Sequence, residues 1–381
     1  MAYFNYNRRK SSVAQIGDTP MGGENPIRIQ SMANVSTMDT EAAVAQAIRM
    51  IEAGAEYVRF TAQGEREARN LGEIRKQLNE QGYTTPLVAD IHFNPRAADA
   101  AAEVEKVRIN PGNYVDKVKT FSHLEYTDEE YAAEIEKIRE RFVPFLNICK
   151  AHGTAIRIGV NHGSLSDRIM SRYGDTPEGM VESCMEFLRI CRSENFDNVV
   201  ISIKASNTVI MVRTVRLLRI CREENFPDVV ISIKASNTVV MVRTVRLLVR
   251  TMEAENMHYP LHLGVTEAGD GEDGRIKSAV GIGTLLCDGI GDTIRVSLSE
   301  DPEAEMPVAR KLVDYIRERE NHRPIEASMA PGFDTVATSR RISRVVEGIG
   351  GTFSPVVISD RSSGDFEFDY LSLPDYIYIG K

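Results

Sequence analysis

The chain has 381 residues, of which 42% are hydrophobic and 27% charged, and its net charge at pH 7 is −9. This composition excludes a disordered chain, and the acidic balance argues against general nucleic-acid binding while permitting a local basic pocket. The sequence contains no run of eighteen apolar residues, and its N-terminal stretch MAYFNYNRRKSS lacks the apolar segment of a signal peptide. We therefore expect a cytoplasmic protein with no membrane or nucleic-acid partner, large enough for one barrel-sized domain and a smaller piece.

Runs of apolar and β-branched residues predict nine strands, and helical patterns separate them. The candidate strands cover residues 27–32, 56–62, 87–93, 107–113, 155–161, 199–206, 229–236, 262–268 and 293–299. Thr127 to Glu130 form a capping box at the start of one helix, and Thr176 followed by Pro177 marks the start of another. Regular alternation of strands and helices is typical of a parallel sheet with helical crossovers.

One strand-and-helix unit is written twice, since residues 188–217 recur as 218–247 with four differences. Each copy has the apolar run VVISI, as in a parallel strand buried on both faces, and then a polar turn in which Asn207 or Thr208 can cap a helix. Without one copy, the strands number eight and their span approaches the roughly 250 residues of a (β/α)8 barrel. We predict an α/β fold: a TIM barrel with one duplicated βα unit. Eight strands should close, with one copy extruded at the surface or exchanged with a partner chain.

Polar and charged side chains gather where the predicted strands end, which is where barrel enzymes place their chemistry. The candidates are Arg59, Asp90, His92, Arg108, Arg157, Asn161, Lys204 or Lys234, Glu267, Arg295 and Ser297. Four arginines and a lysine at one mouth would repel one another, and a dianion such as a diphosphate would relieve that repulsion. Any single arginine is equally compatible with a surface ion pair, and Asp90 with His92 is equally compatible with a structural hydrogen-bonded pair.

The five cysteines, Cys149, Cys184, Cys191, Cys221 and Cys287, contain no C-x-x-C spacing. We interpret them as small core residues kept reduced in the cytoplasm, and we predict no metal ligands. The absence of G-x-G-x-x-G after the first strand also weakens a dinucleotide-binding interpretation.

Several long motifs resemble the 4-hydroxy-3-methylbut-2-enyl diphosphate synthase family. They are VADIHF at 88–93, RINPGN at 108–113, RIGVNHGSLSDRI at 157–169, SIKASN at 202–207, HLGVTEAGDGEDGRIKSAVGIG at 262–283 and GIGDTIRVSLSEDPE at 289–303. The segment YGDTPEGMVES at 173–183 and the tail PDYIYIG at 374–380 are similar to the long form of the family, which has an extra domain after the barrel.

The resemblance implies an iron–sulfur oxidoreductase of isoprenoid biosynthesis, in the methylerythritol phosphate pathway. Its reaction is the reductive ring opening of 2-C-methyl-D-erythritol 2,4-cyclodiphosphate through a [4Fe-4S] cluster, with reduced flavodoxin or ferredoxin as electron donor. The resemblance also makes a homodimer the candidate assembly. The residues matching the family's substrate site are Arg59, His92, Arg108, Arg157, Asn161, Lys204, Lys234, Arg295 and Ser297. Asp90 lies in the same pocket, and Glu267 of the T-E-A-G turn is the candidate for proton transfer.

The sequence also departs from the family. The family holds its cluster with three cysteines and a glutamate in a C-terminal domain, and we find no such ligands in this chain. We expect residues 8–300 to form the substrate-binding barrel and 301–381 to be a truncated middle domain, the beginning of a second α/β domain, without an iron–sulfur domain. The chain should then bind substrate without turning it over. The alternatives are another anion-binding barrel, such as a pterin-binding enzyme or metal-dependent lyase, or an inactive scaffold.

Overall fold

We describe the protein from a computed structural model of the whole chain. The structure describes residues 5–91, 94–115, 125–161, 163–204, 219–220, 222–223, 229–320, 322–323, 325–326, 334, 339–364 and 373–380. The side chains of Ile203, Lys204 and Ile233 are not described. The chain divides into two compact units, Met1–Pro331 and Gly332–Lys381, and each is treated by itself.

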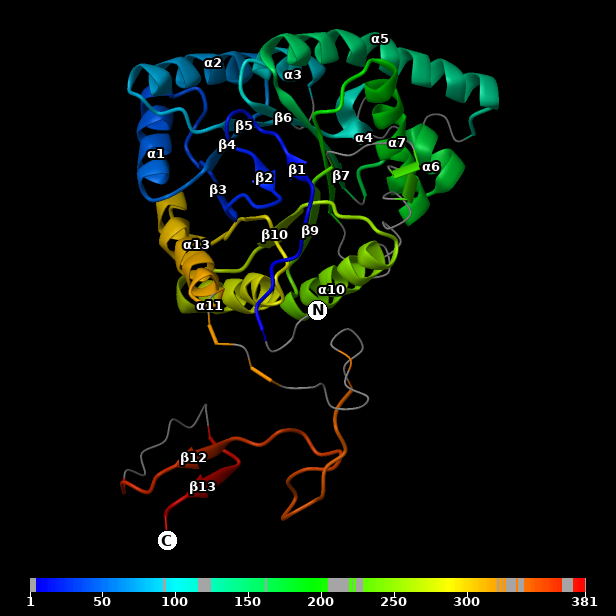
Figure 1. Cartoon of the computed structure of the whole chain (residues 1–381). Helices are drawn as coiled ribbons and strands as arrows, with labels where there is room; N and C mark the ends of the chain where they lie inside the picture. The colour runs from blue at the N-terminus through cyan, green and yellow to red at the C-terminus, as the bar shows by residue number, and fades with distance from the viewer. Residues whose placement is uncertain are drawn as a thin grey trace. The chain divides into compact units, whose positions relative to one another are not determined.

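The first unit is a closed barrel of parallel strands, as the alternating pattern predicts (Figure 1). In chain order its strands are β3 Arg28–Met32, β4 Tyr57–Ala62, β5 Leu87–Ile91, β6 Lys106–Ile109, β7 Ala155–Asn161, β8 Val199–Lys204, β9 Ile231–Ala235, β10 Leu261–Val265 and β11 Thr293–Ile294. Around the barrel, β11 closes back on β3, with Thr293 opposite Arg28.

The prediction that eight strands close was wrong, because both copies of the duplicated unit place a strand in the barrel. β8 and β9 pair residue for residue, with Ile201 opposite Ile231 and Ser202 opposite Ser232, and β9 then pairs with β10. Two identical strands offer the same hydrogen-bonding edge and the same inward side chains, so the second fits without a change of register. Extrusion would instead have exposed an apolar strand with an unpaired edge. Asn207 and Thr208, predicted to cap a helix in the first copy, lie outside the described residues.

Helices cover the outside of the barrel (Figure 1). The longer ones are α1 Thr40–Glu52, α2 Glu65–Glu80, α5 Asp128–His152, α7 Pro177–Ser193, α10 Thr238–Ala254 and α13 Pro302–Arg317, and the shorter ones are α3 Pro95–Ala101, α4 Pro111–Tyr114, α6 Asp167–Tyr173, α11 Gly271–Ser278 and α12 Thr284–Cys287, with a π-helical turn at Ala279–Gly283. The capping box predicted at Thr127 and the cap predicted at Thr176 are both confirmed. In the second copy Asn237 caps α10 by accepting from the Val240 amide.

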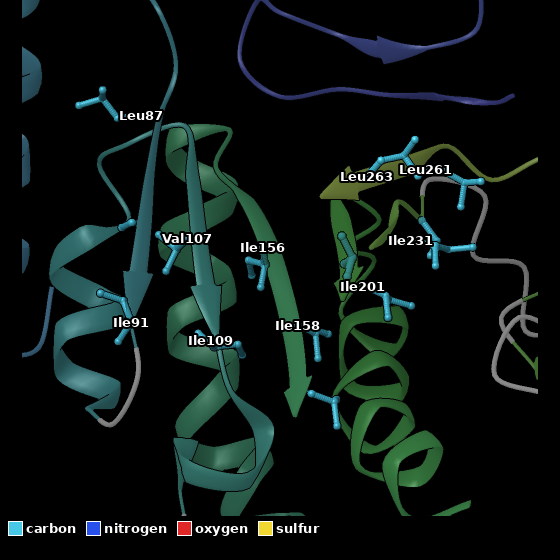
Figure 2. Close-up of a cluster of buried hydrophobic side chains, with 14 of the residues drawn as sticks. Leu87, Ile91, Val107, Ile109, Ile156, Ile158, Ile201, Ile231, Leu261 and Leu263 are labelled. Carbon is cyan, nitrogen blue, oxygen red and sulfur yellow. The ribbon is translucent and has the colours of Figure 1, made fainter. Parts of the chain in front are cut away.

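The strands bury alternate residues on two sides. Outward residues such as Val107, Ile156 and Ile201 pack in the apolar layer between the strands and the helices (Figure 2). The first inward residues, among them Tyr57 and Val88, form a separate small apolar cluster inside the barrel. This alternation follows from the two-residue period of a strand. The inward residues that come two and four positions further along each strand therefore line the barrel interior above the apolar cluster.

A short hairpin closes the end of the barrel where the strands begin. Its strands are β1 Val13–Ala14 and β2 Met21–Gly22, which pair antiparallel. Ile16 and Met21 are fully buried in the interior apolar cluster, beneath the polar layers. The barrel therefore opens only at the carboxyl ends of its strands, within the part of the chain that the structure describes.

The barrel unit continues past residue 300, because α13 packs on β3 and α1 through residues such as Met306 and Val313. In the second unit, β12 Ile358–Asp360 pairs in parallel with β13 Tyr376–Tyr378. Across the described residues, no helix combines the length and the apolar character needed to cross a bilayer.

Candidate functional site

A cavity of about 260 Å³ lies inside the barrel at the carboxyl ends of the strands. It brings together eight of the predicted site residues, which are Arg59, Asp90, Arg108, Arg157, Asn161, Lys234, Arg295 and Ser297. Its remaining wall residues are Met32, Ser202, Ser232, Val265 and Thr266. Side chains from β4, β5, β6, β7 and β9 and from the segment following β11 thus converge on one space, which a single strand could not provide.

Three predicted residues are not part of this described wall. His92 lies outside the described residues, and for Lys204 the structure describes only the backbone of β8. Glu267 is exposed on the turn after β10 and does not line the cavity. Its backbone has φ of 55°, a left-handed conformation that is uncommon for residues other than glycine. Its role in proton transfer stays a prediction.

Arg59 and Asp90 form the ion pair at the centre of the cavity wall, with Nη2 of the arginine donating to Oδ2 of the aspartate. Burial alone would raise the pKa of the Asp90 carboxyl, but the charges of Arg59, Arg108 and Arg157 outweigh burial and hold that pKa well below its usual range. Asp90 is therefore ionised at neutral pH and compensates one of the surrounding cations.

The other cations have little compensation. Burial and the neighbouring arginines lower the pKa of Arg157 to about 9, and burial with the charge of Arg59 lowers the pKa of Arg295 to about 10. Burial, followed by the charges of Arg295, Arg59 and Arg157, lowers the pKa of Lys234 well below its usual value. The five basic side chains of this cavity outnumber the carboxyl groups beside them, which are Asp90 in the wall and Glu305 near Arg295, so an anion would compensate the remaining positive charge.

Two glycines make room for the cations. A Cβ at Gly159 would lie 2.5 Å from Nε of Arg108, and a Cβ at Gly264 would lie 3.3 Å from Cε of Lys234. Gly159 falls in the RIGVN segment and Gly264 in HLGVTEAG, each on a strand beside the strand that carries the cation. Sequence reasoning did not assign these glycines a role, although their position in otherwise apolar strands was a signal.

A second polar layer lies below the cavity, two residues closer to the start of each strand, and sequence reasoning missed it. A small space of about 10 Å³ is lined there by Gln30, Lys106, Ser232, His262 and Thr293, among others. Burial and the nearby positive charges lower the pKa of Lys106 and of His262 well below their usual values. Both residues occupy the inward period-two positions of their strands, which is the pattern that could have identified them.

The described residues do not fit an iron–sulfur cluster. They contain no group of three or more histidines, cysteines or acidic residues placed to hold a metal ion. Cys149, Cys184 and Cys191 are buried, and burial raises the pKa of the Cys149 and Cys191 thiols far above the usual value, which opposes the thiolate form that iron requires. The interpretation of all cysteines as core residues was wrong for Cys287, which is exposed.

Fold and cavity together define a β/α barrel with a cavity lined by basic side chains at the carboxyl ends of its strands. The chain belongs to the GcpE TIM-barrel domain family, which matches residues 11–220 and 214–310. The two matched segments meet within the duplicated stretch, as expected if the family's domain carries this unit once.

Curated relatives agree with the family. The chain is 92% identical to a protein of Parabacteroides distasonis and 64% identical to one of Bacteroides thetaiotaomicron, over its whole length in both cases. Both relatives are named 4-hydroxy-3-methylbut-2-en-1-yl diphosphate synthase (flavodoxin), so the family resemblance read from the motifs is confirmed. The chain covers 58% and 57% of their respective lengths.

Among solved structures, the chain is similar to a dihydropteroate synthase from Stenotrophomonas maltophilia, with 14% identity and a TM-score of 0.45 over 81% of this chain and 98% of that one.

Proposed function

We propose that this barrel is the substrate-binding part of a 4-hydroxy-3-methylbut-2-en-1-yl diphosphate synthase, and that its cavity holds 2-C-methyl-D-erythritol 2,4-cyclodiphosphate. The observation that carries the proposal is the set of five cationic side chains facing one carboxylate inside a closed barrel. A cyclic diphosphate supplies two of the negative charges that such a set lacks, and guanidinium groups match phosphate oxygens in geometry.

In this proposal the chain's own residues bind and orient the substrate. Arg108, Arg157, Arg295 and Lys234 contact phosphate oxygens, while Asp90 keeps Arg59 fixed by their ion pair. Asn161 and Ser297, at the mouth, are neutral hydrogen-bonding groups for the rest of the ligand. Glu267, on its exposed turn, is the proposed proton donor. A substrate that folds the turn inward would bring this carboxyl to the cavity.

The redox part of the reaction is proposed for the whole protein only. A [4Fe-4S] cluster would relay two electrons, one at a time, and flavodoxin, which appears in the relatives' name, would be the donor of both. The described residues do not fit such a cluster. We also propose a cytoplasmic location and a homodimer, as the family resemblance implies, and a middle domain that begins after the barrel unit, which ends at Pro331 and not at residue 300.

Calorimetric titration of the chain with the cyclodiphosphate tests the binding proposal. We expect saturable heat that is lost when Arg157 and Arg295 are both replaced by methionine, which keeps the length of each side chain but removes its charge. Inorganic phosphate should compete only weakly, since it engages fewer of the cations. No heat at millimolar cyclodiphosphate would contradict the proposed function.

A further inference from the structure

The duplicated unit places the same serine twice in the cavity wall. Ser202 on β8 and Ser232 on β9 occupy equivalent positions of the two copies. They lie side by side, since the two strands are adjacent and pair in register at these residues. Both line the cavity. They are chemically identical, so any difference between them comes from their neighbours.

Those neighbours differ. Oγ of Ser202 accepts a hydrogen bond of 2.7 Å from Nη2 of Arg157, which lies on the adjacent β7. Ser232 faces β10 instead, and its hydroxyl has no hydrogen-bond partner among the described residues although the residue is only 2% exposed. A buried hydroxyl without a partner is costly, so a position of this kind calls for an acceptor.

Ser232 lies between two spaces, since it belongs to the wall of the cavity and to the wall of the small space beneath it. Rotation about its Cα–Cβ bond moves the hydroxyl among three staggered positions, and a serine hydroxyl donates one hydrogen bond. Lys234, two residues further along the same strand, lines the same cavity. A phosphate oxygen near Lys234 is thus within the reach of a neighbouring donor.

We propose that Ser232 is an additional phosphate-binding residue, and that the two copies of the unit have different tasks: Ser202 holds Arg157 in place, while Ser232 donates its hydroxyl to the bound phosphate. This inference rests on the proposed function, since it assumes a phosphate ligand in the cavity. In a barrel with one copy, a single serine would neighbour both β7 and β10. With two copies, the serine of β8 lies beside β7 and the serine of β9 lies beside β10, so each hydroxyl has one of these two strands as its neighbour.

The matched variants Ser232→Ala and Ser202→Ala test this assignment by calorimetry with the cyclodiphosphate and by thermal unfolding. We expect Ser232→Ala to weaken binding about tenfold, the effect of one lost hydrogen bond to a charged group. The midpoint of unfolding should not fall in this variant, because its hydroxyl has no partner to lose. Ser202→Ala should lower the midpoint, since Arg157 loses an acceptor, and should weaken binding less. Ser193→Ala, on the outer helix α7, is a control with unchanged affinity.

The outcomes separate the two proposals. Heat from the unaltered chain together with an unchanged affinity of Ser232→Ala would overturn the assignment of Ser232 alone. An affinity loss in Ser202→Ala equal to or larger than that in Ser232→Ala would overturn the division of tasks. Absence of binding by the unaltered chain would overturn the proposed function and this inference with it.

Discussion

Glu305, on helix α13, is predicted to hold the loop that carries part of the anion pocket. Its carboxylate accepts from Oγ of Ser31 at 2.7 Å and from the backbone amide of Leu298 at 3.0 Å, and the residue is 4% exposed. Leu298 directly follows Ser297, which lines the cavity. A buried carboxylate that accepts two such bonds fixes the segment after β11 against β3.

Replacing Glu305 with alanine leaves the Leu298 amide and the Ser31 hydroxyl without their acceptor. An orphaned buried polar group costs about 1–3 kcal/mol, so the loss of the acceptor of both groups should lower the free energy of unfolding by about 2–6 kcal/mol. Replacing it with glutamine keeps an oxygen for the Leu298 amide and offers an amide hydrogen to the Ser31 oxygen, so most of this stability should remain. Thermal unfolding of the two variants measures the difference.

The affinity of the Glu305 variants for the cyclodiphosphate distinguishes two roles of this residue: positioning the segment after β11, or acting through its negative charge. The carboxylate lies close enough to Arg295 for their charges to interact, so if charge alone mattered, both substitutions would tighten anion binding. If Glu305 acts by positioning, alanine weakens binding about tenfold and glutamine does not. Glu303→Ala is the control, since Glu303 pairs with Arg49 at 2.6 Å outside the barrel. Binding by Glu305→Ala as tight as that of the unaltered chain would refute the positioning role.

Three further predictions concern stability and protons. Arg168 and Glu186 form a buried ion pair of 2.6 Å, and Glu186 also accepts from the Tyr131 hydroxyl. Arg168→Met alone should therefore lower the free energy of unfolding by about 3–5 kcal/mol, and adding Glu186→Leu together with Tyr131→Phe should restore most of it; equal loss in both variants would contradict this. Between the lowered pKa of Lys234 and the ordinary lysine pKa, the unfolded chain binds more protons than the folded chain, so stability should rise with pH across that window. Anion binding in the same window should take up a proton, detected as a buffer-dependent heat. Deleting residues 218–247 should leave a cooperatively folded barrel, because β8 then offers β10 the edge that β9 offers now; loss of the thermal transition would exclude this.

The barrel and most of its pocket could be predicted because their signals are local. Arginine or lysine within an otherwise apolar strand is costly unless it faces a ligand, and Arg59, Arg108, Arg157 and Arg295 each carry that signal in their own segment. The VVISI run likewise predicts a buried strand wherever it occurs.

The remaining features depend on contacts between segments that are far apart in the sequence. Closure with nine strands requires β9 to pair with β10, which no property of the repeat itself reveals. The role of Glu305 depends on α13 folding back against β3, whereas the sequence placed this helix at the start of another domain. Ser232 differs from Ser202 only through neighbouring strands, and identical residues cannot show that difference in a sequence.

The hairpin β1–β2 closes the barrel interior at the end where the strands begin. Ile16 and Met21 fill the closed end, so the cations above them have an apolar base and, among the described residues, an opening only at the carboxyl ends of the strands. Field lines from charges in a low-dielectric cleft leave through its mouth, which concentrates positive potential there and raises the rate at which anions arrive. A polar substitution at Met21 that admits water from below would therefore slow the capture of ligand, and added salt would then change the association rate less than it does in the unaltered protein.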